Sequence, residues 1–139
     1  YINNKLNLDN LMYIGIRSID NFEKRIIDEN NIKYISSFNF NNNYNESEKK
    51  IKNFIGDNDV HISFDVDCID PVNMHSTGTK SNNGLDVYKL KKIINFLVNK
   101  KKILNIDLTE LNFELSNKKQ KDKSLNTIKE IFSFLFSNR

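Results

Sequence analysis

Short apolar runs of strand length alternate with segments of helical periodicity along the whole chain, and this alternation limits the fold more than any other feature. The apolar runs predict strands over residues 11–17, 33–38, 60–66 and 102–108. The helical spacings predict helices over residues 20–30, 46–55, 86–99 and 124–136. Strands that are joined by helical crossovers form a parallel sheet. The expected fold is therefore α/β, with one parallel sheet and helices packed on both of its faces.

Two polar stretches lie outside these predicted elements. The asparagine-rich segment 39–45 predicts an exposed loop, and the lysine-rich segment 118–123 predicts a solvated one. By contrast, Asp20 precedes the first predicted helix and Glu23 follows three residues later, a spacing typical of a helix N-terminal capping box. No internal repeat interrupts the pattern, so the 139 residues fit one domain or a part of one.

The composition excludes several classes of protein. A formal net charge of +3 is too small for a nucleic-acid-binding surface, and no apolar run approaches the roughly 20 residues that span a bilayer. A single cysteine excludes an internal disulfide framework and a cysteine-based zinc site, and it favours a reducing compartment. The chain starts at Tyr1 without a signal-peptide pattern, which suggests a piece of a longer protein. Its abundant Asn, Lys and Ile favour an AT-rich genome as the source.

Acidic residues follow three of the four predicted strands. Asp20 and Glu23 come after the first strand, Asp65 and Asp67 end the third, and Glu110 follows the fourth. In an open parallel sheet, ligands bind outside the carboxyl ends of the strands, and all three groups fall on that edge. The sequence therefore predicts a ligand site there.

Asp65 and Asp67 form the strongest local signal. Residues two apart in a strand point to the same side, so this pair would present two carboxylates together. Like charges this close are costly unless a cation neutralises them, and a hard divalent metal prefers oxygen ligands. A pair of solvated strand-end acids is the alternative, which the buried character of the preceding strand disfavours. Asp70, before Pro71, is expected to cap a turn.

Three sequence stretches together resemble one family. Residues 65–71 read Asp-Val-Asp-Cys-Ile-Asp-Pro, followed by Thr-Gly-Thr at 77–79 and Gly-Leu at 84–85. This order and spacing resemble the signature loop of the ureohydrolases, and within them of the arginases. Segments 13–23 and 106–112 resemble the arginase strand-to-helix segment and its late strand ending in glutamate. The resemblance implies that residues 1–139 are the C-terminal part of a single ureohydrolase domain, with a partial three-layer α/β/α fold.

The resemblance also implies a metal centre and a reaction. Arginases hold two manganese ions and hydrolyse L-arginine to L-ornithine and urea, and Asp65 and Asp67 match two of their metal ligands. The remaining ligands and the proton-shuttling histidine of the family belong to its N-terminal half, and no segment here matches them. The two histidines, His61 and His75, match no family ligand; His61 is interpreted as a core or edge residue and His75 as solvated. The chain alone is therefore expected to be inactive. Cys68 is interpreted as a small packing residue.

Substrate contacts follow from the same resemblance. Glu110 matches the glutamate that pairs with the substrate guanidinium, and Thr79 matches a threonine that lines the same pocket. Asp20 and Glu23 match the acids that recognise the substrate α-amino group. Arginases commonly form trimers or hexamers, so a cytoplasmic homo-oligomer that binds neither nucleic acid nor membrane is expected. Two alternatives remain open: an agmatinase or other ureohydrolase for a linear guanidinium substrate, and a non-catalytic homologue.

Overall fold

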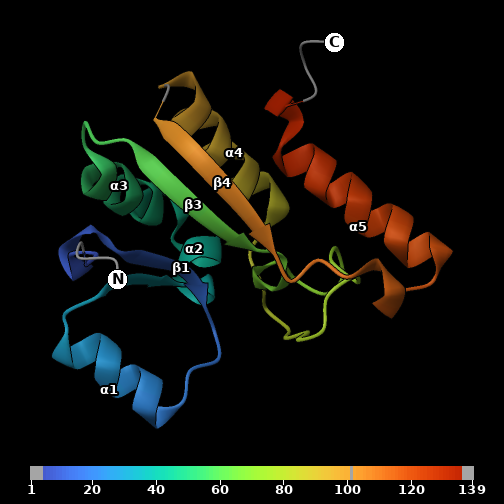
Figure 1. Ribbon diagram of the computed structural model, residues 1–139, viewed down its shortest axis with the longest axis horizontal. Helices are drawn as coiled ribbons and strands as arrows, with labels where there is room; N and C mark the ends of the chain where they lie inside the picture. The colour runs from blue at the N-terminus through green and yellow to red at the C-terminus, as the bar shows by residue number, and fades with distance from the viewer. Residues whose placement is uncertain (1–4, 101, 136–139) are drawn as a thin grey trace.

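The computed structural model describes residues 5–100 and 102–135, and it has the expected alternation of strands and helices (Figure 1). The strands are β1 Met12–Ile16, β2 Lys33–Ser36, β3 Val60–Asp65 and β4 Ile103–Thr109. The helices are α1 Asn21–Glu29, α2 Ser37–Asn42, α3 Tyr44–Ile55, α4 Val87–Asn99 and α5 Lys118–Ile131. Short 3-10 turns occupy Leu8–Asn10, Val66–Cys68, Phe113–Leu115 and Ser133–Leu135.

The described strands pair in parallel, as the helical crossovers predict. They form two separate two-stranded sheets rather than the single sheet that was expected, because β1 pairs with β2 and β3 pairs with β4. Side-chain packing joins the two sheets: Ile35 of β2 and Phe64 of β3 belong to one buried apolar cluster. The α/β class is confirmed, and the cohesion between the two strand pairs comes from the core.

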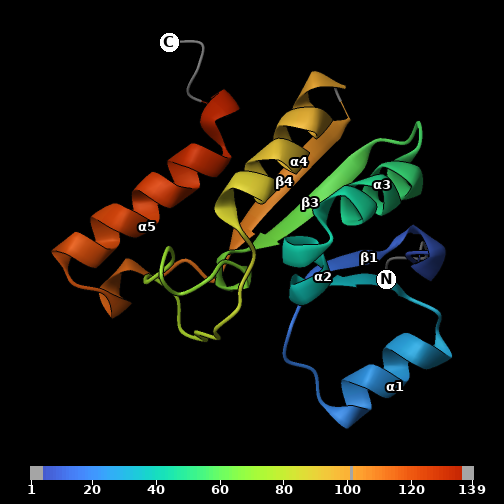
Figure 2. The same ribbon diagram turned by 180° about the vertical axis from the view of Figure 1, so that it is seen from behind.

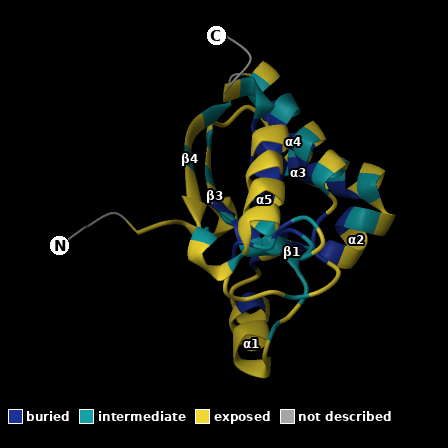
Figure 3. Ribbon diagram, turned by 90° about the vertical axis from the view of Figure 1, so that its right-hand side faces the viewer, coloured by how far each residue is buried: buried dark blue, intermediate teal, exposed yellow. Residues whose placement is uncertain are grey.

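Helices lie on different sides of the two strand pairs. α1 lies on the opposite side of β1 and β2 from α3 (Figures 1 and 2). α3, α4 and α5 lie on one side of β3 and β4, as the turned view shows (Figure 3). On β3 and β4 the exposed side chains include His61, Ser63, Asn105 and Asp107. Within the described residues, helices thus lie on one side of β3 and β4, and the exposed side chains of these strands are mostly polar, with Leu104 and Leu108 exposed as well.

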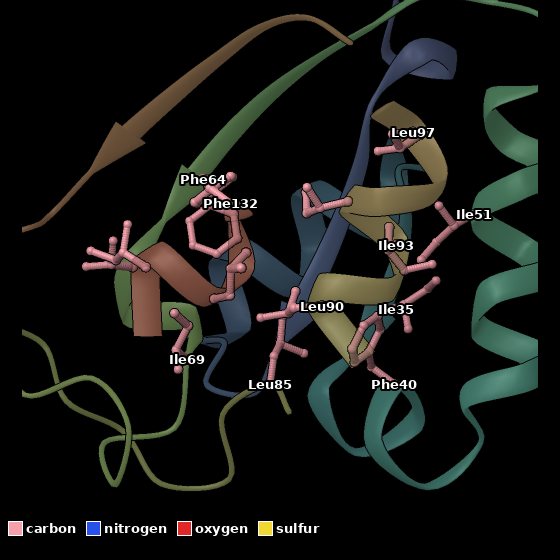
Figure 4. Close-up of a cluster of buried hydrophobic side chains, with 14 of the residues drawn as sticks. Ile35, Phe40, Ile51, Phe64, Ile69, Leu85, Leu90, Ile93, Leu97 and Phe132 are labelled. Atoms are coloured by element: carbon pink, nitrogen blue, oxygen red, sulfur yellow. The ribbon is translucent and has the colours of Figure 1, made fainter. Parts of the chain in front are cut away.

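The core forms where α4 packs against the segment from β2 to α3. Leu90, Ile93 and Leu97 form the predicted apolar stripe of α4, and Figure 4 shows them beside Ile35, Phe40 and Ile51. At the other end, the rings of Phe64 and Phe132 meet edge to face with centroids 5.1 Å apart. Complete burial of each such side chain stabilises a fold by about 1.5–3 kcal/mol.

The predicted loop at 39–45 is wrong, because most of it is helical. α2 runs to Asn42 and α3 begins at Tyr44. Because α2 already begins at Ser37, the strand that was predicted to reach residue 38 ends at Ser36. The Ser36 hydroxyl caps α2 by accepting a hydrogen bond from the Asn39 N–H at 3.2 Å. Phe40 is completely buried in the core. Tertiary burial of this ring therefore outweighs the weak local preference of asparagine for loops.

The predicted loop at 118–123 is also wrong, because these residues form the first turns of α5. Asn117 and Gln120 make a capping box, in which each side chain accepts a hydrogen bond from the other's backbone N–H. The helix ends at Ile131 and not at residue 136, and a 3-10 turn follows over Ser133–Leu135; residue 136 lies outside the described residues. The lysines of this segment lie on a helix whose buried positions begin at Ser124.

Gly15 shapes the end of β1. Its φ of +96° is in the region that favours glycine, and the pairing with β2 shifts register between Ile14 and Ile16. A Cβ at this position would lie 2.8 Å from the Leu85 side chain. The irregularity lets Leu85 pack onto the strand, and it directs the chain beyond β1 towards the loop that follows β3.

No helix in the described part of the chain is long and apolar enough to cross a membrane.

Candidate carboxylate site

Asp65 and Asp67 lie at the carboxyl end of β3, but they do not share a strand. β3 ends at Asp65, and Asp67 lies in the 3-10 turn Val66–Cys68. The predicted strand geometry is therefore wrong for Asp67. The reason is local, because the Asp65 carboxylate accepts a hydrogen bond from the Asp67 N–H at 2.9 Å and caps the turn. The turn still leaves both acids together, and each is half-buried.

A third carboxylate joins this pair from the neighbouring strand. Asp65 pairs with Thr109 at the end of β4, and Glu110 is the next residue. Burial raises the pKa of the Asp67 carboxyl above its ordinary value, and the charges of Asp65 and Glu110 raise it further, whereas the Arg17 guanidinium lowers it. The predicted gathering of acids at the carboxyl edge thus holds for Asp65, Asp67 and Glu110.

Glu110 has an uncommon backbone conformation. Its φ of +60° lies in the left-handed region, which a residue with a β-carbon adopts at a cost of order 1 kcal/mol. The side chain is exposed. Two residues further on, the Asn112 N–H donates to the Ser76 carbonyl oxygen at 2.9 Å and ties this segment to the loop that follows β3.

Arg17 belongs to the site, although the sequence predicted no role for it. It follows β1, and its Nε donates to the Ser81 carbonyl oxygen at 3.2 Å while its Nη2 donates to the Asp67 carbonyl oxygen. The guanidinium therefore links both ends of the segment from Asp67 to Ser81. Its position directly after a strand, next to the acidic residues, was the available signal.

A cleft of about 710 Å³ opens between β1, α1 and this segment. Three of the sequence-predicted residues line it, namely Glu23, Asp67 and Thr79, and Arg17 lines it as well. Asp20, Asp65 and Glu110 are not among its lining residues. The structure thus places Asp65, Asp67 and Glu110 at the ends of β3 and β4, and Glu23, Asp67 and Thr79 in the cleft wall. Asp20 belongs to neither group.

Asp20 and Glu23 form the predicted capping box at the start of α1. The Glu23 N–H donates to Asp20 Oδ1 at 2.8 Å, and the Asp20 N–H donates to Glu23 Oε2 at 3.0 Å. Both side chains are exposed. Each bond uses one carboxylate oxygen, so helix capping already accounts for both residue types at this spacing.

The donor chemistry at β3 fits part of a metal centre. Carboxylate oxygens suit a hard divalent cation, and a cation would relieve the repulsion among Asp65, Asp67 and Glu110. Residues 5–100 and 102–135 nevertheless contain no group of three or more His, Cys, Asp and Glu arranged to hold a metal ion. His61 lies elsewhere on β3, with its Nε2 3.2 Å from Asp107 Oδ2. The two aspartates could therefore supply only part of a coordination shell.

Two further residues of the signature loop, Asp70 and Cys68, have structural roles. Asp70 accepts hydrogen bonds from the Val72 N–H at 3.0 Å and the Gly84 N–H at 3.2 Å, so the predicted turn cap is confirmed. Burial raises the pKa of the Cys68 thiol to about 12. A thiol with this pKa stays protonated near neutral pH, which agrees with its interpretation as a packing residue.

Comparisons with known proteins agree on one family. The model of the Arginase family matches residues 1–133. The arginase of Neurospora crassa is 34% identical over 109 residues, which cover 77% of this chain and 30% of that protein. The arginase of Plasmodium falciparum is 32% identical over 108 residues, covering 75% of this chain and 26% of that protein.

The fold agrees as well. The crystal structure of Entamoeba histolytica arginase in complex with L-ornithine superposes with a TM-score of 0.81 at 26% sequence identity. The superposition covers 94% of this chain and 45% of that one. The chain thus spans about a third or less of the two curated relatives and under half of the solved structure.

Proposed function

The chain belongs to the arginase family, and on that basis we propose that the complete protein hydrolyses L-arginine to L-ornithine and urea with manganese. The observation that carries the proposal is the cluster of Asp65, Asp67 and Glu110 at the ends of two adjacent parallel strands. These are the positions that match metal and guanidinium ligands of the family. In an α/β sheet this edge is where ligands bind.

Asp65 and Asp67 would hold the metal ions together with ligands from outside this chain. Bound manganese supplies a water that is nucleophilic near neutral pH and polarises the reacting centre. The raised pKa of Asp67 reflects burial and neighbouring negative charge. A cation at this place would favour the ionised carboxylate that ligation requires.

Glu110 would bind the substrate guanidinium. A planar guanidinium and a carboxylate form a strong, directional pair of charge-assisted hydrogen bonds. Thr79, in the wall of the cleft, would line the same pocket, and Asp20 and Glu23 would recognise the α-amino group, using the oxygens that the capping box leaves. The similarity to an arginase solved in complex with L-ornithine, one of the two products of the proposed reaction, supports a substrate of this chemistry.

The chain would make up the C-terminal part of one ureohydrolase domain. Its similarity to less than half of a solved arginase chain, at 94% of its own length, supports its being one part of such a domain. We further propose a cytoplasmic homo-oligomer, a trimer or hexamer as is common in the family, with L-arginine as its ligand. Size-exclusion chromatography with light scattering on the product of the complete reading frame tests the assembly.

The direct test measures urea release by the product of the complete reading frame with manganese, using L-arginine and agmatine side by side. We expect turnover of L-arginine, lost in Asp65→Ala and in Glu110→Ala. Glu114→Ala is the matched control, because Glu114 is another exposed glutamate close to Glu110 in the chain. Manganese binding should fall in Asp65→Ala and persist in Glu110→Ala.

Other results would change the conclusion. Preference for agmatine would reject the roles of Asp20 and Glu23 while keeping the metal site. An absence of turnover with both substrates, together with an absence of manganese binding, would favour a non-catalytic homologue.

A further inference from the structure

Two buried serine side chains, Ser76 and Ser124, form a hydrogen-bonded node between α5 and the loop from Asp70 to Gly84. Ser76, in this loop, and Ser124, on α5, are both completely buried. Ser124 Oγ accepts hydrogen bonds from the His75 N–H at 2.9 Å and from the Ser76 N–H at 3.1 Å. One side chain of α5 therefore holds two consecutive backbone groups of a loop that lies 48 or more residues away in the sequence.

Ser76 in turn holds the segment that follows β4. Its carbonyl oxygen accepts the Asn112 N–H at 2.9 Å, and its hydroxyl lies 2.7 Å from that of Ser116. A further bond from Thr127 Oγ1 to the Asn73 carbonyl oxygen, 3.0 Å long, ties the start of the loop to α5. The three segments that meet at Ser76 are the loop, the β4–α5 connection and α5 itself.

Two residues with proposed substrate roles lie next to this node. Thr79 is three residues beyond Ser76, and Glu110 is two residues before Asn112. Glu110 holds a left-handed backbone conformation, with φ +60°, which persists only where neighbouring contacts impose it. The Asn112–Ser76 hydrogen bond is such a contact, and Ser124 fixes its acceptor.

We propose that Ser124 is a positioning residue for the guanidinium-binding side of the site. By holding the backbone of His75 and Ser76, it fixes the loop that carries Thr79 and, through the Ser76 carbonyl group, the backbone that carries Glu110. The proposal rests on the proposed hydrolysis of L-arginine. α5 then acts on the site through the backbone of the loop that its Ser124 and Thr127 side chains hold.

The test compares Ser124→Ala with Ser124→Thr in the product of the complete reading frame. Alanine removes the acceptor of both N–H groups, and threonine keeps it. Steady-state kinetics with L-arginine and manganese give KM and kcat, and hydrogen–deuterium exchange reports the backbone amides of residues 75–76 and 112. Ser47→Ala is the matched control, since Ser47 is also buried and hydrogen-bonded, at 3.1 Å to the Asn39 carbonyl oxygen, but lies on α3.

A displaced binding carboxylate weakens ground-state and transition-state contacts alike, so KM should change more than kcat. We expect Ser124→Ala to raise KM about tenfold, with kcat altered less than about threefold and manganese affinity unchanged. Amide exchange should accelerate at residues 75–76 and also at residue 112. Ser124→Thr should have a KM close to that of the wild type, and Ser47→Ala should leave both KM and kcat unchanged.

Several outcomes would overturn the proposal. Unchanged exchange at residue 112 would show that Ser76 does not transmit the effect, and an equal rise of KM in Ser47→Ala would show a general loss of stability. A fall of kcat at unchanged KM would reject the guanidinium side. If Ser124→Ala does not fold, Ser116→Ala replaces it, because this change removes the partner of the Ser76 hydroxyl. We then expect the same changes in KM and amide exchange, but smaller ones.

The exchange readout also separates this inference from the proposed function. A wild-type protein that releases no urea from L-arginine would reject the function. The amide of residue 112 would then decide whether Ser124 couples the two segments: faster exchange in Ser124→Ala supports the coupling, and unchanged exchange overturns it.

Discussion

Replacing Gly84 with alanine should destabilise the protein through a clash with the turn at Asp70. A Cβ at Gly84 would lie 2.2 Å from the Asp70 backbone nitrogen and 2.4 Å from the Ile69 carbonyl carbon. These are backbone atoms, so no side-chain rotation can relieve the contact. Gly84 is therefore required by close approach of two backbone segments, in the Gly-Leu part of the signature loop.

The size of the effect follows from how firmly the two segments are joined. Leu85 N–H donates to the Cys68 carbonyl oxygen at 2.8 Å, and Gly84 N–H donates to Asp70 Oδ2 at 3.2 Å. Overpacking of a buried site costs about 1–3 kcal/mol where neighbours can adjust. Here both neighbours are anchored, so we expect a loss of about 3 kcal/mol in the free energy of unfolding.

Gly78→Ala is the matched control within the same loop. Its Cβ would approach nothing closer than Leu115 Cδ1 at 3.9 Å, an ordinary van der Waals distance. Where the native conformation suits alanine, a Gly→Ala change stabilises by about 0.4–1 kcal/mol by reducing the freedom of the unfolded chain.

Urea denaturation of the product of the complete reading frame, at an unchanged m value, measures both changes. A Gly84→Ala protein within about 0.5 kcal/mol of wild type, a shift of the size that ordinary surface substitutions produce, would refute the clash. Equal losses in the two variants would refute the argument that backbone contact distinguishes them.

Three further changes test other parts of the structure. The Tyr44 hydroxyl is buried and has no hydrogen-bond partner among the described residues, so Tyr44→Phe should leave thermal stability unchanged or slightly raised. Burial raises the pKa of Tyr44 to about 12. Because this exceeds the unfolded value near 10, the free energy of unfolding should fall as pH rises from about 10 to 12, and Tyr44→Phe should lack that part of the fall in denaturation curves. Asp20→Ala removes an N-cap and should cost about 1 kcal/mol in the same assay, with faster amide exchange in the first turn of α1 as its local sign. Ile131→Ala empties a completely buried position and should cost about 2–5 kcal/mol, whereas Leu125→Ala, a partly exposed position on the same helix, should cost much less.

The alternation of elements and the capping box of α1 could be predicted because both are local. Spacings of three and four residues place Leu90, Ile93 and Leu97 on one face of α4, and that face is the buried one. Asp20 and Glu23 satisfy backbone groups within four residues of themselves. Such features need no knowledge of the rest of the fold.

The two predicted loops failed for different reasons, the first non-local and the second local. Both segments have loop-like composition. The asparagine-rich segment nevertheless carries a ring that the core buries, and the lysine-rich segment follows a capping residue that starts a helix. Phe40 lies in the core beside α4, and Asn117 with Gln120 starts α5. In the asparagine-rich segment, the composition describes the exposed residues and conceals the buried ring of Phe40.

The same difference between local pattern and long-range contact applies to the candidate site. The strand order brings Asp65 and Glu110 to one edge whatever their side chains do, because parallel strands end together. The contacts of Arg17 with Ser81 and of Ser124 with Ser76 join residues 64 and 48 positions apart, and no periodicity relates them. Sequence therefore predicts that Asp65, Asp67 and Glu110 gather, whereas the hydroxyl and guanidinium groups that hold the neighbouring backbone are found only in the three-dimensional structure. A substitution such as Ser124→Ala, outside every recognisable motif, should for this reason affect substrate binding more than its distance in sequence from Glu110 suggests.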